Sequence, residues 1–337
     1  MKRFITIKDI AKELNISVST VSRALRDTYD VNKETRDKVL EIASRLNYKP
    51  NFNATGLAKR SSHNIAVILP FITNYYFSTV ITGIQEVAYE KGYNIVLYVT
   101  NDSPERELNI INNLPITSLD GLLVSIASNS DSYEHFEEII ANETPIVFFD
   151  RVTNHLETSR VIQDDYNGAF EAVEHLIENG YNKIAHIAGP ASLTFTQNRL
   201  KGYLAALEKH QLEVKEEWII HSGFSQKDGV DDATRLFNSE NKPDAIFAAN
   251  DRKAIGAMTY LKSKGIKIGQ EVGIVGFTND PSSEIISPSL TTIAEPAFEI
   301  GRKSCELLLR HIEKKYFQPQ EIVFPGKLIV RESSIKV

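Results

Sequence analysis

The stretch that decides the fold of the first part of the chain is TIKDIAKELNISVSTVSRAL, which runs from Thr6 to Leu25. Its first half repeats apolar residues at helical spacing, at Ile7, Ile10, Ala11 and Leu14. Asn15 interrupts the pattern, and Ser17 is a suitable N-cap for a second helix. Two short helices joined by a tight turn predict a helix-turn-helix.

The second of these helices has a polar face suited to a DNA groove. We expect Val21 and Ala24 to point inward, which leaves the outward face to Val18, Ser19, Ser22, Arg23 and Arg26. A face of this kind fits the major groove, where an arginine can bind a guanine edge through two hydrogen bonds. We expect Thr6, Ser17 and Thr20 to hold phosphates, which position the domain without reading sequence. The alternative is a three-helix module that binds protein.

The segment around this motif has the charge of a nucleic-acid-binding module. A third helix is predicted from about Asn32 to Leu46, before Pro50 ends the helical pattern. Residues 1–60 contain 13 Lys and Arg against 7 Asp and Glu, whereas the whole chain of 337 residues has a net charge of −6. A basic head on an acidic body favours a nucleic-acid partner for the head.

From residue 64 onward, short apolar runs alternate with amphipathic helical stretches. The runs are residues 65–69, 95–99, 121–124, 146–149, 184–187, 218–220, 245–248 and 272–277. Strands that alternate with helices predict βαβ units, with parallel sheets covered by helices on both faces. This number of units exceeds one ordinary doubly wound sheet, so we expect two similar lobes.

Other functions leave no trace in the sequence. It has no motif typical of catalytic, nucleotide-binding or metal-binding sites, so we expect no catalytic residues, no metal and no cofactor. The only cysteine, Cys305, cannot form a disulfide within the chain. The first residues lack the apolar core of a signal peptide, and no apolar run is long enough to span a membrane. These features predict a cytoplasmic protein.

The motifs together resemble one known family. Residues 6–11 (TIKDIA), 17–25 (SVSTVSRAL) and 46–51 (LNYKPN) are similar to the head of the lactose-repressor (LacI/GalR) family, and the likeness continues to residues 328–333 (LIVRES). The resemblance implies an all-α head over residues 1–49, a hinge helix over 50–60, and a body over 61–337 like periplasmic sugar-binding proteins. It places lobe one at about 61–162 and 294–323, and lobe two at about 163–293 and 324–337.

The hinge is expected to act in the minor groove. In the family this segment becomes a hinge helix that enters the minor groove as a pair, and Leu57 matches a leucine that wedges between base pairs. Asn51 and Ala54 are the other hinge residues expected to contact DNA. An isolated helix this short is marginal in water, and Gly56 weakens it further. We therefore expect the segment to fold only on DNA, with a permanently flexible linker as the alternative.

The resemblance also implies a ligand cleft between the lobes. The residues that it places there are Tyr76, Phe77, Asp150, Arg151, Arg199, Phe224, Asn250, Thr278 and Asn279. An aspartate and an arginine together can accept from and donate to vicinal hydroxyls. The family usually has an aspartate where this chain has Thr278, so a carboxylate is missing there. Thr278 or Asn279 would then serve as a neutral partner.

These features predict a transcriptional regulator, most simply a repressor, whose DNA affinity is controlled by a small molecule. We expect a homodimer on a pseudo-palindromic operator in double-stranded DNA, with a carbohydrate as effector. The alternatives are a repressor that needs a purine-type corepressor, an activator, and a sugar-binding protein without a regulatory role.

Overall fold

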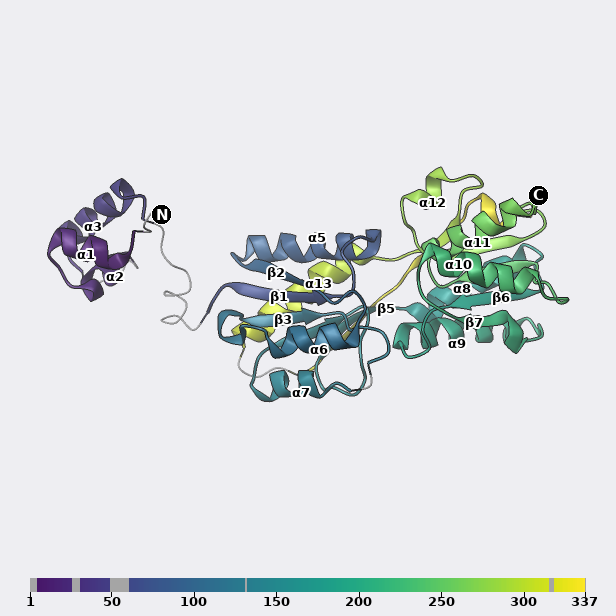
Figure 1. Cartoon of the computed structure of the whole chain (residues 1–337), viewed down its shortest axis with the longest axis horizontal. Coiled ribbons are helices and arrows are strands. Elements are labelled where there is room, and N and C mark those ends of the chain that lie inside the picture. Colours follow the sequence, from purple (N-terminus) through teal and green to yellow (C-terminus); the bar gives the residue numbers. More distant parts are fainter. Residues whose placement is uncertain (1–4, 26–30, 49–60, 131, 315–317, 337) are drawn as a thin grey trace. The chain divides into compact units, whose positions relative to one another are not determined.

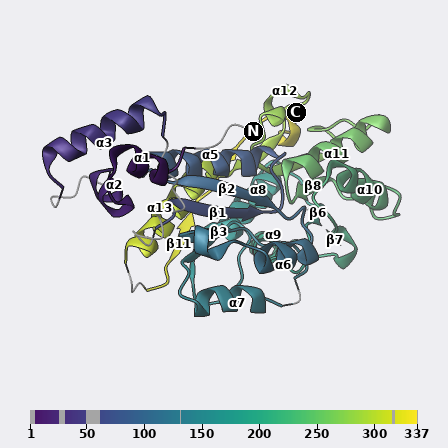
Figure 2. The same cartoon turned by 60° about the vertical axis from the view of Figure 1, so that its left-hand side comes forward.

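The computed structural model describes residues 5–25, 31–48, 61–130, 132–314 and 318–336. The chain forms two compact units, residues 1–62 and residues 63–337. The first is a helical head and the second is an α/β body, drawn in Figure 1 and in a second view in Figure 2. Residues 50–60, where we expect the hinge, lie outside the described ranges.

The head contains α1 (Ile7–Leu14), α2 (Val18–Leu25) and α3 (Lys33–Arg45). Asn15 ends α1 in the left-handed conformation (φ 53°), which turns the chain into α2 within three residues. The three helices share a small core formed by Ile10, Ala11, Val21, Ala24, Val39 and Ala43. The predicted helix-turn-helix is therefore present, with the expected residues of α2 on its inner face.

One sheet of the body has six strands, all parallel. Its strands are β1 (Asn64–Leu69), β2 (Asn94–Val99), β3 (Gly121–Val124), β4 (Ile146–Phe149), β5 (Ser159–Gln163) and β11 (Glu321–Phe324). They lie in the order β11-β5-β4-β3-β1-β2, which leaves β2 at one edge. Helices α5 (Tyr75–Glu90) and α13 (Ala297–Glu313) cover one face; α6 (Pro104–Asn112) and α7 (Glu134–Ala141) cover the other.

The second sheet also has six strands. They are β6 (Ile184–Ala188), β7 (Ile219–His221), β8 (Ala245–Ala248), β9 (Gly273–Thr278), β10 (Thr291–Ala294) and β12 (Lys327–Ile329), in the order β12-β10-β9-β8-β6-β7. Only β12 runs antiparallel to its neighbour. Helices α8 (Asp165–Glu178) and α9 (Thr194–Lys209) cover one face; α10 (Gln226–Phe237) and α11 (Asp251–Ser263) cover the other. The short α12 (Ser282–Ile285) follows β9.

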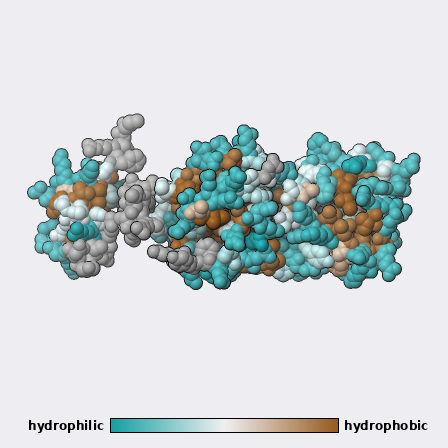
Figure 3. All heavy atoms as spheres, turned by 90° about the horizontal axis from the view of Figure 1, so that it is seen from below, coloured by the Kyte–Doolittle hydropathy of each residue, from teal (hydrophilic) through white to brown (hydrophobic). Residues whose placement is uncertain are grey.

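The chain passes between the two sheets three times. It crosses after β5, after β10 and between β11 and β12. Each sheet is buried between helices, while the surface in Figure 3 shows hydrophobic patches among hydrophilic side chains on both lobes. The α/β fold class predicted from the alternating pattern is confirmed, with two lobes of parallel strands.

Four strands were not predicted from the sequence: β5, β10, β11 and β12. Two are edge strands of three or four residues, and β11 alternates between exposed and partly buried positions. β10 begins with Thr291 and Thr292, which are fully buried although polar. Such strands lack the continuous apolar run that marks a buried parallel strand.

Helices α10 and α11 cross at two glycines that allow their backbones to touch. A Cβ on Gly229 would lie 2.1 Å from the carbonyl oxygen of Lys253, and a Cβ on Gly256 would lie 2.1 Å from that of Gln226. Both obstacles are backbone atoms, so a methyl group at either position forces the helices apart. The first turns of α10 and α11 are thereby held side by side.

We predict that Gly256→Ala lowers the free energy of unfolding by about 2–3 kcal/mol, because overpacking strains a close helix contact. Chemical denaturation of the purified protein measures this change. Thr259→Ala, on the exposed face of the same helix, is the matched control and should change stability little. Equal stabilities for Gly256→Ala and the wild type would contradict the close packing of α10 and α11.

Candidate functional site

The outer face of α2 is the candidate DNA-contacting surface of the head. Val18, Ser19 and Arg23 are exposed, whereas Val21 and Ala24 are buried in the head core. Ser17 caps the helix, since its hydroxyl oxygen accepts a hydrogen bond from the backbone N–H of Thr20 at 3.0 Å. The buried side of α2 thus fixes which side chains face outward.

Hydroxyl groups gather at the start of both head helices. The Ser17 hydroxyl lies 2.7 Å from the hydroxyls of Ser19 and of Thr20. Thr6 donates its hydroxyl proton to the carboxylate of Asp9 at 2.6 Å. A phosphate oxygen accepts hydrogen bonds only, so Thr6 has to release Asp9 before it can bind one. Among the other residues predicted to contact DNA, Ser22 is partly buried on α2, and Arg26, Asn51, Ala54 and Leu57 lie outside the described residues.

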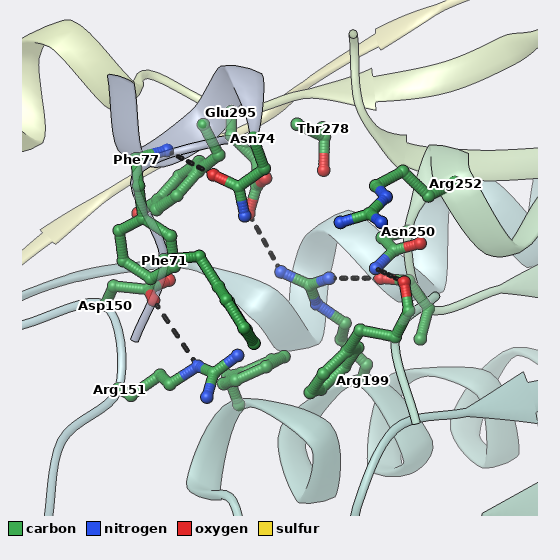
Figure 4. Close-up of a pocket in the computed structure, with 14 residues that line it drawn as sticks. Phe71, Asn74, Phe77, Asp150, Arg151, Arg199, Asn250, Arg252, Thr278 and Glu295 are labelled. Atoms are coloured by element: carbon green, nitrogen blue, oxygen red, sulfur yellow. Dashed lines mark hydrogen bonds and ion pairs between the residues drawn. The ribbon is translucent and has the colours of Figure 1, made fainter. Parts of the chain in front are cut away.

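The second candidate site is a cleft in the body, where strands of both sheets end (Figure 4). Its empty space is about 520 Å³, counted out to the solvent. Phe71, Asn74, Tyr76, Phe77, Asp150, Arg151, Phe195, Arg199, Phe224, Ala249, Asn250, Arg252, Thr278 and Glu295 line it. The carboxyl ends of parallel strands are where open α/β sheets bind ligands. The cleft therefore brings together every predicted ligand residue except Asn279.

Arg151 is a buried cation that contacts both walls of the cleft. Its Nη1 donates to Asp102 Oδ1 at 2.6 Å and to Ser128 Oγ at 3.1 Å. Its guanidinium lies 6.0 Å from the ring centre of Phe77 and 5.2 Å from that of Phe224. Phe77 belongs to α5 and Phe224 precedes α10, so Arg151 links residues from the two lobes by cation–π contacts.

Arg199 holds two carboxylates at the back of the cleft. Its Nε donates to Asp165 Oδ1 at 2.8 Å, its Nη2 to Glu295 Oε1 at 2.9 Å, and its Nη1 to the carbonyl of Ala249 at 2.5 Å. The guanidinium also lies 3.5 Å from the ring centre of Phe277. Arg199 forms ion pairs with two carboxylates, and its N–H donors are directed at protein atoms. Its main role is therefore to hold the residues of the site in place.

Three carboxyl groups surround this arginine, and burial shifts all of them. Burial raises the pKa of Glu295 to about 7 and that of Asp165 to about 6, against the opposing attraction of Arg199. Burial also raises the pKa of Asp150, although Arg151 favours its charged form. Burial, with the neighbouring Asp150 carboxylate, raises the pKa of Tyr76, so this phenol stays protonated. The charge of Glu295 therefore changes near neutral pH, and that of Asp165 changes slightly below it.

Aromatic and amide side chains complete the walls. The rings of Phe195 and Phe224 stack with centroids 5.6 Å apart. Asn250 caps α11 by accepting from the N–H of Lys253, and its Nδ2 donates to the carbonyl of Phe224 at 3.1 Å. Asn250 is thereby fixed in orientation while it still lines the cleft.

At Thr278, where the family usually has an aspartate, a residue that follows the neighbouring strand supplies a carboxylate. Thr278 lines the cleft beside Glu295, the residue that follows β10, whose backbone N–H donates to the carbonyl of Thr278 at 3.4 Å. Asn279 instead accepts a hydrogen bond from Arg331 Nη2 at 2.8 Å and does not line the cleft. A carboxylate is thus present beside Thr278, but it comes from a different strand.

Several lining residues were not predicted from the sequence. Glu295 follows β10 and lines the cleft, whereas Asp165 begins α8 and binds Arg199 without lining it; both were missed because their partner Arg199 is far away in sequence. Asn74 accepts from the N–H of Phe77 at 2.8 Å and so caps α5, a role that its position before a helix makes predictable. Phe195 and Arg252 lie on helices and carry no local signal.

The chain combines a DNA-binding head with a sensor body, and comparisons with known proteins agree. Residues 6–51 match the family model described as bacterial regulatory proteins, lacI family, and residues 173–334 match a periplasmic binding protein-like domain. Catabolite control protein A of Priestia megaterium is 30% identical, over 98% of this chain and 99% of that protein. The transcriptional repressor PurR of Actinobacillus pleuropneumoniae serotype 3 is 33% identical, over 97% and 98%.

Solved structures agree with this assignment. The lac repressor dimer bound to operator and the anti-inducer ONPF covers 99% of this chain and 100% of that chain, with a TM-score of 0.86 and 25% identity. The complex of the regulator CelR with cellobiose covers 98% and 99%, with a TM-score of 0.74 and 25% identity. The chain belongs to the LacI family of transcriptional regulators: it binds DNA through its head and is controlled by a ligand.

In the described part of the chain, no helix is both long and apolar enough to cross a membrane.

We predict that Glu295 makes the protein less stable as the pH rises from about 5 to 8. Its pKa of about 7 in the folded protein exceeds its ordinary value of 4.5, so the folded state binds its proton more tightly. That stabilisation is complete below pH 4.5 and is lost as the pH rises through 7. At about 1.4 kcal/mol for each pKa unit, the loss is at most on the order of 3 kcal/mol.

Unfolding midpoints of the wild type and of Glu295→Gln, measured between pH 5 and 8, test this. The wild type should lose more stability over this interval than the variant, which keeps an acceptor for Arg199 but has no proton to release. Glu299→Gln, on the exposed face of α13, should follow the wild type. Parallel curves for wild type and Glu295→Gln would rule out the raised pKa.

Proposed function

We propose that this regulator is a repressor that binds a pseudo-palindromic operator as a homodimer and releases it when a carbohydrate enters the cleft. In this proposal residues 1–49 read the DNA, residues 50–60 form the hinge, and residues 61–337 sense the effector and dimerise. The DNA lies in the cytoplasm, and we infer that the protein works there by binding rather than by catalysis.

The proposal that the effector is a carbohydrate rests on one observation: the cleft combines aromatic faces with polar groups that are held in place. Asp150 and Glu295 offer acceptors to sugar hydroxyls, and Asn250 offers both a donor and an acceptor. Phe77 and Phe224 offer flat apolar surfaces against which a sugar ring can lie. The cellobiose complex of the similar regulator CelR supports this choice.

A purine-type corepressor is the second candidate, and one observation favours it. Phe195 and Phe224 stack in the cleft at an interplanar angle of 25°, which is a platform for a flat base. A base needs such a platform more than a sugar does, whereas a sugar needs more acceptors. The two candidates also differ in sign, because a corepressor strengthens operator binding and an inducer weakens it.

We predict that monosaccharides or disaccharides at millimolar concentration raise the thermal unfolding midpoint and that purines do not. A ligand at 100 times its Kd stabilises the folded state by about 2.7 kcal/mol. Arg151→Ala should abolish the shift while operator binding in its absence is retained. Val214→Ala, at an exposed residue of lobe two, is the control. A shift with purines alone would replace the carbohydrate proposal by the corepressor.

The homodimer is supported by an apolar sheet edge. β2 lies at the edge of its sheet and exposes Val96 (36%) and Leu97 (40%) to solvent. An edge strand with exposed apolar side chains invites pairing or packing with another chain. A second copy is the natural occupant, because a two-fold axis would present two heads to a pseudo-palindromic site. The similar lac repressor structure is itself a dimer.

We predict that Leu97→Asp converts the dimer to monomers, because it places a charge in an apolar contact. Sedimentation velocity at micromolar concentration should give a dimer for the wild type and a monomer for the variant. Val214→Asp, a matched apolar-to-acidic change on an exposed residue elsewhere, should remain dimeric. A dimeric Leu97→Asp would show that β2 is not part of the interface.

A further inference from the structure

Three arginines line the cleft, and two of them are already neutralised by the protein. Arg151 donates to Asp102, and its Nε also lies 4.0 Å from a carboxylate oxygen of Asp150. Arg199 lies within 2.9 Å of both Asp165 and Glu295. The positive charge of each of these two guanidinium groups is therefore balanced by carboxylates of the protein. The electrostatic choice of ligand therefore depends on the third arginine.

That arginine is Arg252, in the first turn of α11. It is exposed, and among the described residues it has no hydrogen bond or ion pair. It lines the cleft together with Asn74, Asn250 and Thr278, and in Figure 4 its guanidinium is turned into the space between them. All five of its N–H donors are thus available at the mouth of the cleft.

The place of Arg252 on its helix is unfavourable for a cation. The N-terminus of a helix carries a partial positive charge, which disfavours Lys and Arg in the first turn. α11 has two cations there, and the other, Lys253, is paired with Asp232 at 2.8 Å. Arg252 alone lacks a protein carboxylate, within the described residues. An anionic ligand would remove this repulsion and also benefit from the helix dipole.

The carboxylates beside Arg252 are directed elsewhere. Asp251 is buried, and its two oxygens accept from Thr292, Ser283 and the N–H of Asp280. Asp280 accepts at Oδ1 from the backbone and hydroxyl of Ser282. These donors satisfy both oxygens of Asp251 and Oδ1 of Asp280, so neither carboxylate pairs with Arg252, although both line this end of the cleft. The back of the cleft, with Asp150 and Glu295, offers acceptors.

We propose that the effector is an acidic carbohydrate, whose phosphate or carboxylate group is held by Arg252 while its hydroxyls point to Asp150 and Glu295. This inference rests on the proposed carbohydrate effector and narrows it. A guanidinium binds phosphate or carboxylate through two parallel hydrogen bonds, which a neutral sugar cannot match. With the guanidinium of Arg252, unpaired among the described residues, at one end of the cleft and the acceptors of Asp150 and Glu295 at the other, the ligand lies in one direction.

Calorimetric titration of the full-length wild type tests the proposal with hexoses, the corresponding hexose 6-phosphates and the corresponding uronic acids. An acidic form should bind at least about tenfold more tightly than its neutral parent, as expected for a charge-assisted hydrogen-bonded pair. Arg252→Gln should remove that advantage and leave the affinity for the neutral parent within about threefold. Preference for the phosphate or for the uronate identifies which acidic group is recognised.

A second measurement does not depend on finding the right sugar. Inorganic phosphate, compared with chloride at equal ionic strength, should raise the unfolding midpoint of the wild type more than that of Arg252→Gln. Arg235→Gln, the same change at an exposed position of α10, should respond as the wild type does. Equal responses of wild type and Arg252→Gln would overturn the anion site, as would tighter binding of the neutral sugars. Failure of every sugar, neutral or acidic, would instead overturn the carbohydrate effector itself.

Discussion

The contacts of the buried Arg199 guanidinium are the interaction on which the body depends most. Its two carboxylate partners lie at two of the three chain crossings: Asp165 is the second residue after β5, and Glu295 directly follows β10. The third crossing passes nearby, since a Cβ on Gly326 would lie 3.1 Å from Gln163 Nε2 and 2.6 Å from Ile293. One cation therefore ties together segments that must move if the two lobes move.

Through these ion pairs, ligand binding in the cleft can affect how the two lobes are arranged. A ligand that binds Glu295 or Asp150 competes with the protein's own contacts to Arg199 and Arg151. A desolvated carboxylate gains much from each hydrogen bond. A ligand that takes over one of these hydrogen bonds therefore weakens a contact between the segments at the chain crossings. The body can thus respond as a two-state element, in which the ligand favours one arrangement of the lobes.

Much of the fold and of the site was predictable, because it depends on local patterns. The inward Val21 and Ala24 and the outward Val18 and Arg23 follow from helical spacing, and the buried strands follow from continuous apolar runs. The family resemblance placed Asp150, Asn250 and Thr278 in the cleft, and each lies at or just after the end of a strand. The remainder depends on contacts between distant segments: Arg199 was expected to bind ligand, whereas its donors are directed at Asp165, Glu295 and Ala249. No local pattern reports that pairing, and β10, which delivers Glu295, begins with two buried threonines.

The exchange at Thr278 shows how the site can keep a carboxylate after losing one. Thr278 has φ 131°, a conformation that a β-branched residue rarely adopts. The backbone N–H of Glu295 donates to the carbonyl of Thr278 at 3.4 Å, so an acid at the end of the adjacent strand lies beside Thr278 in place of the family's aspartate. The replacement is not equivalent, since Glu295 is also bound by Arg199 and has a pKa of about 7. A ligand hydroxyl at this wall therefore meets an acid whose charge changes near neutral pH, whereas a freely ionised aspartate keeps its charge.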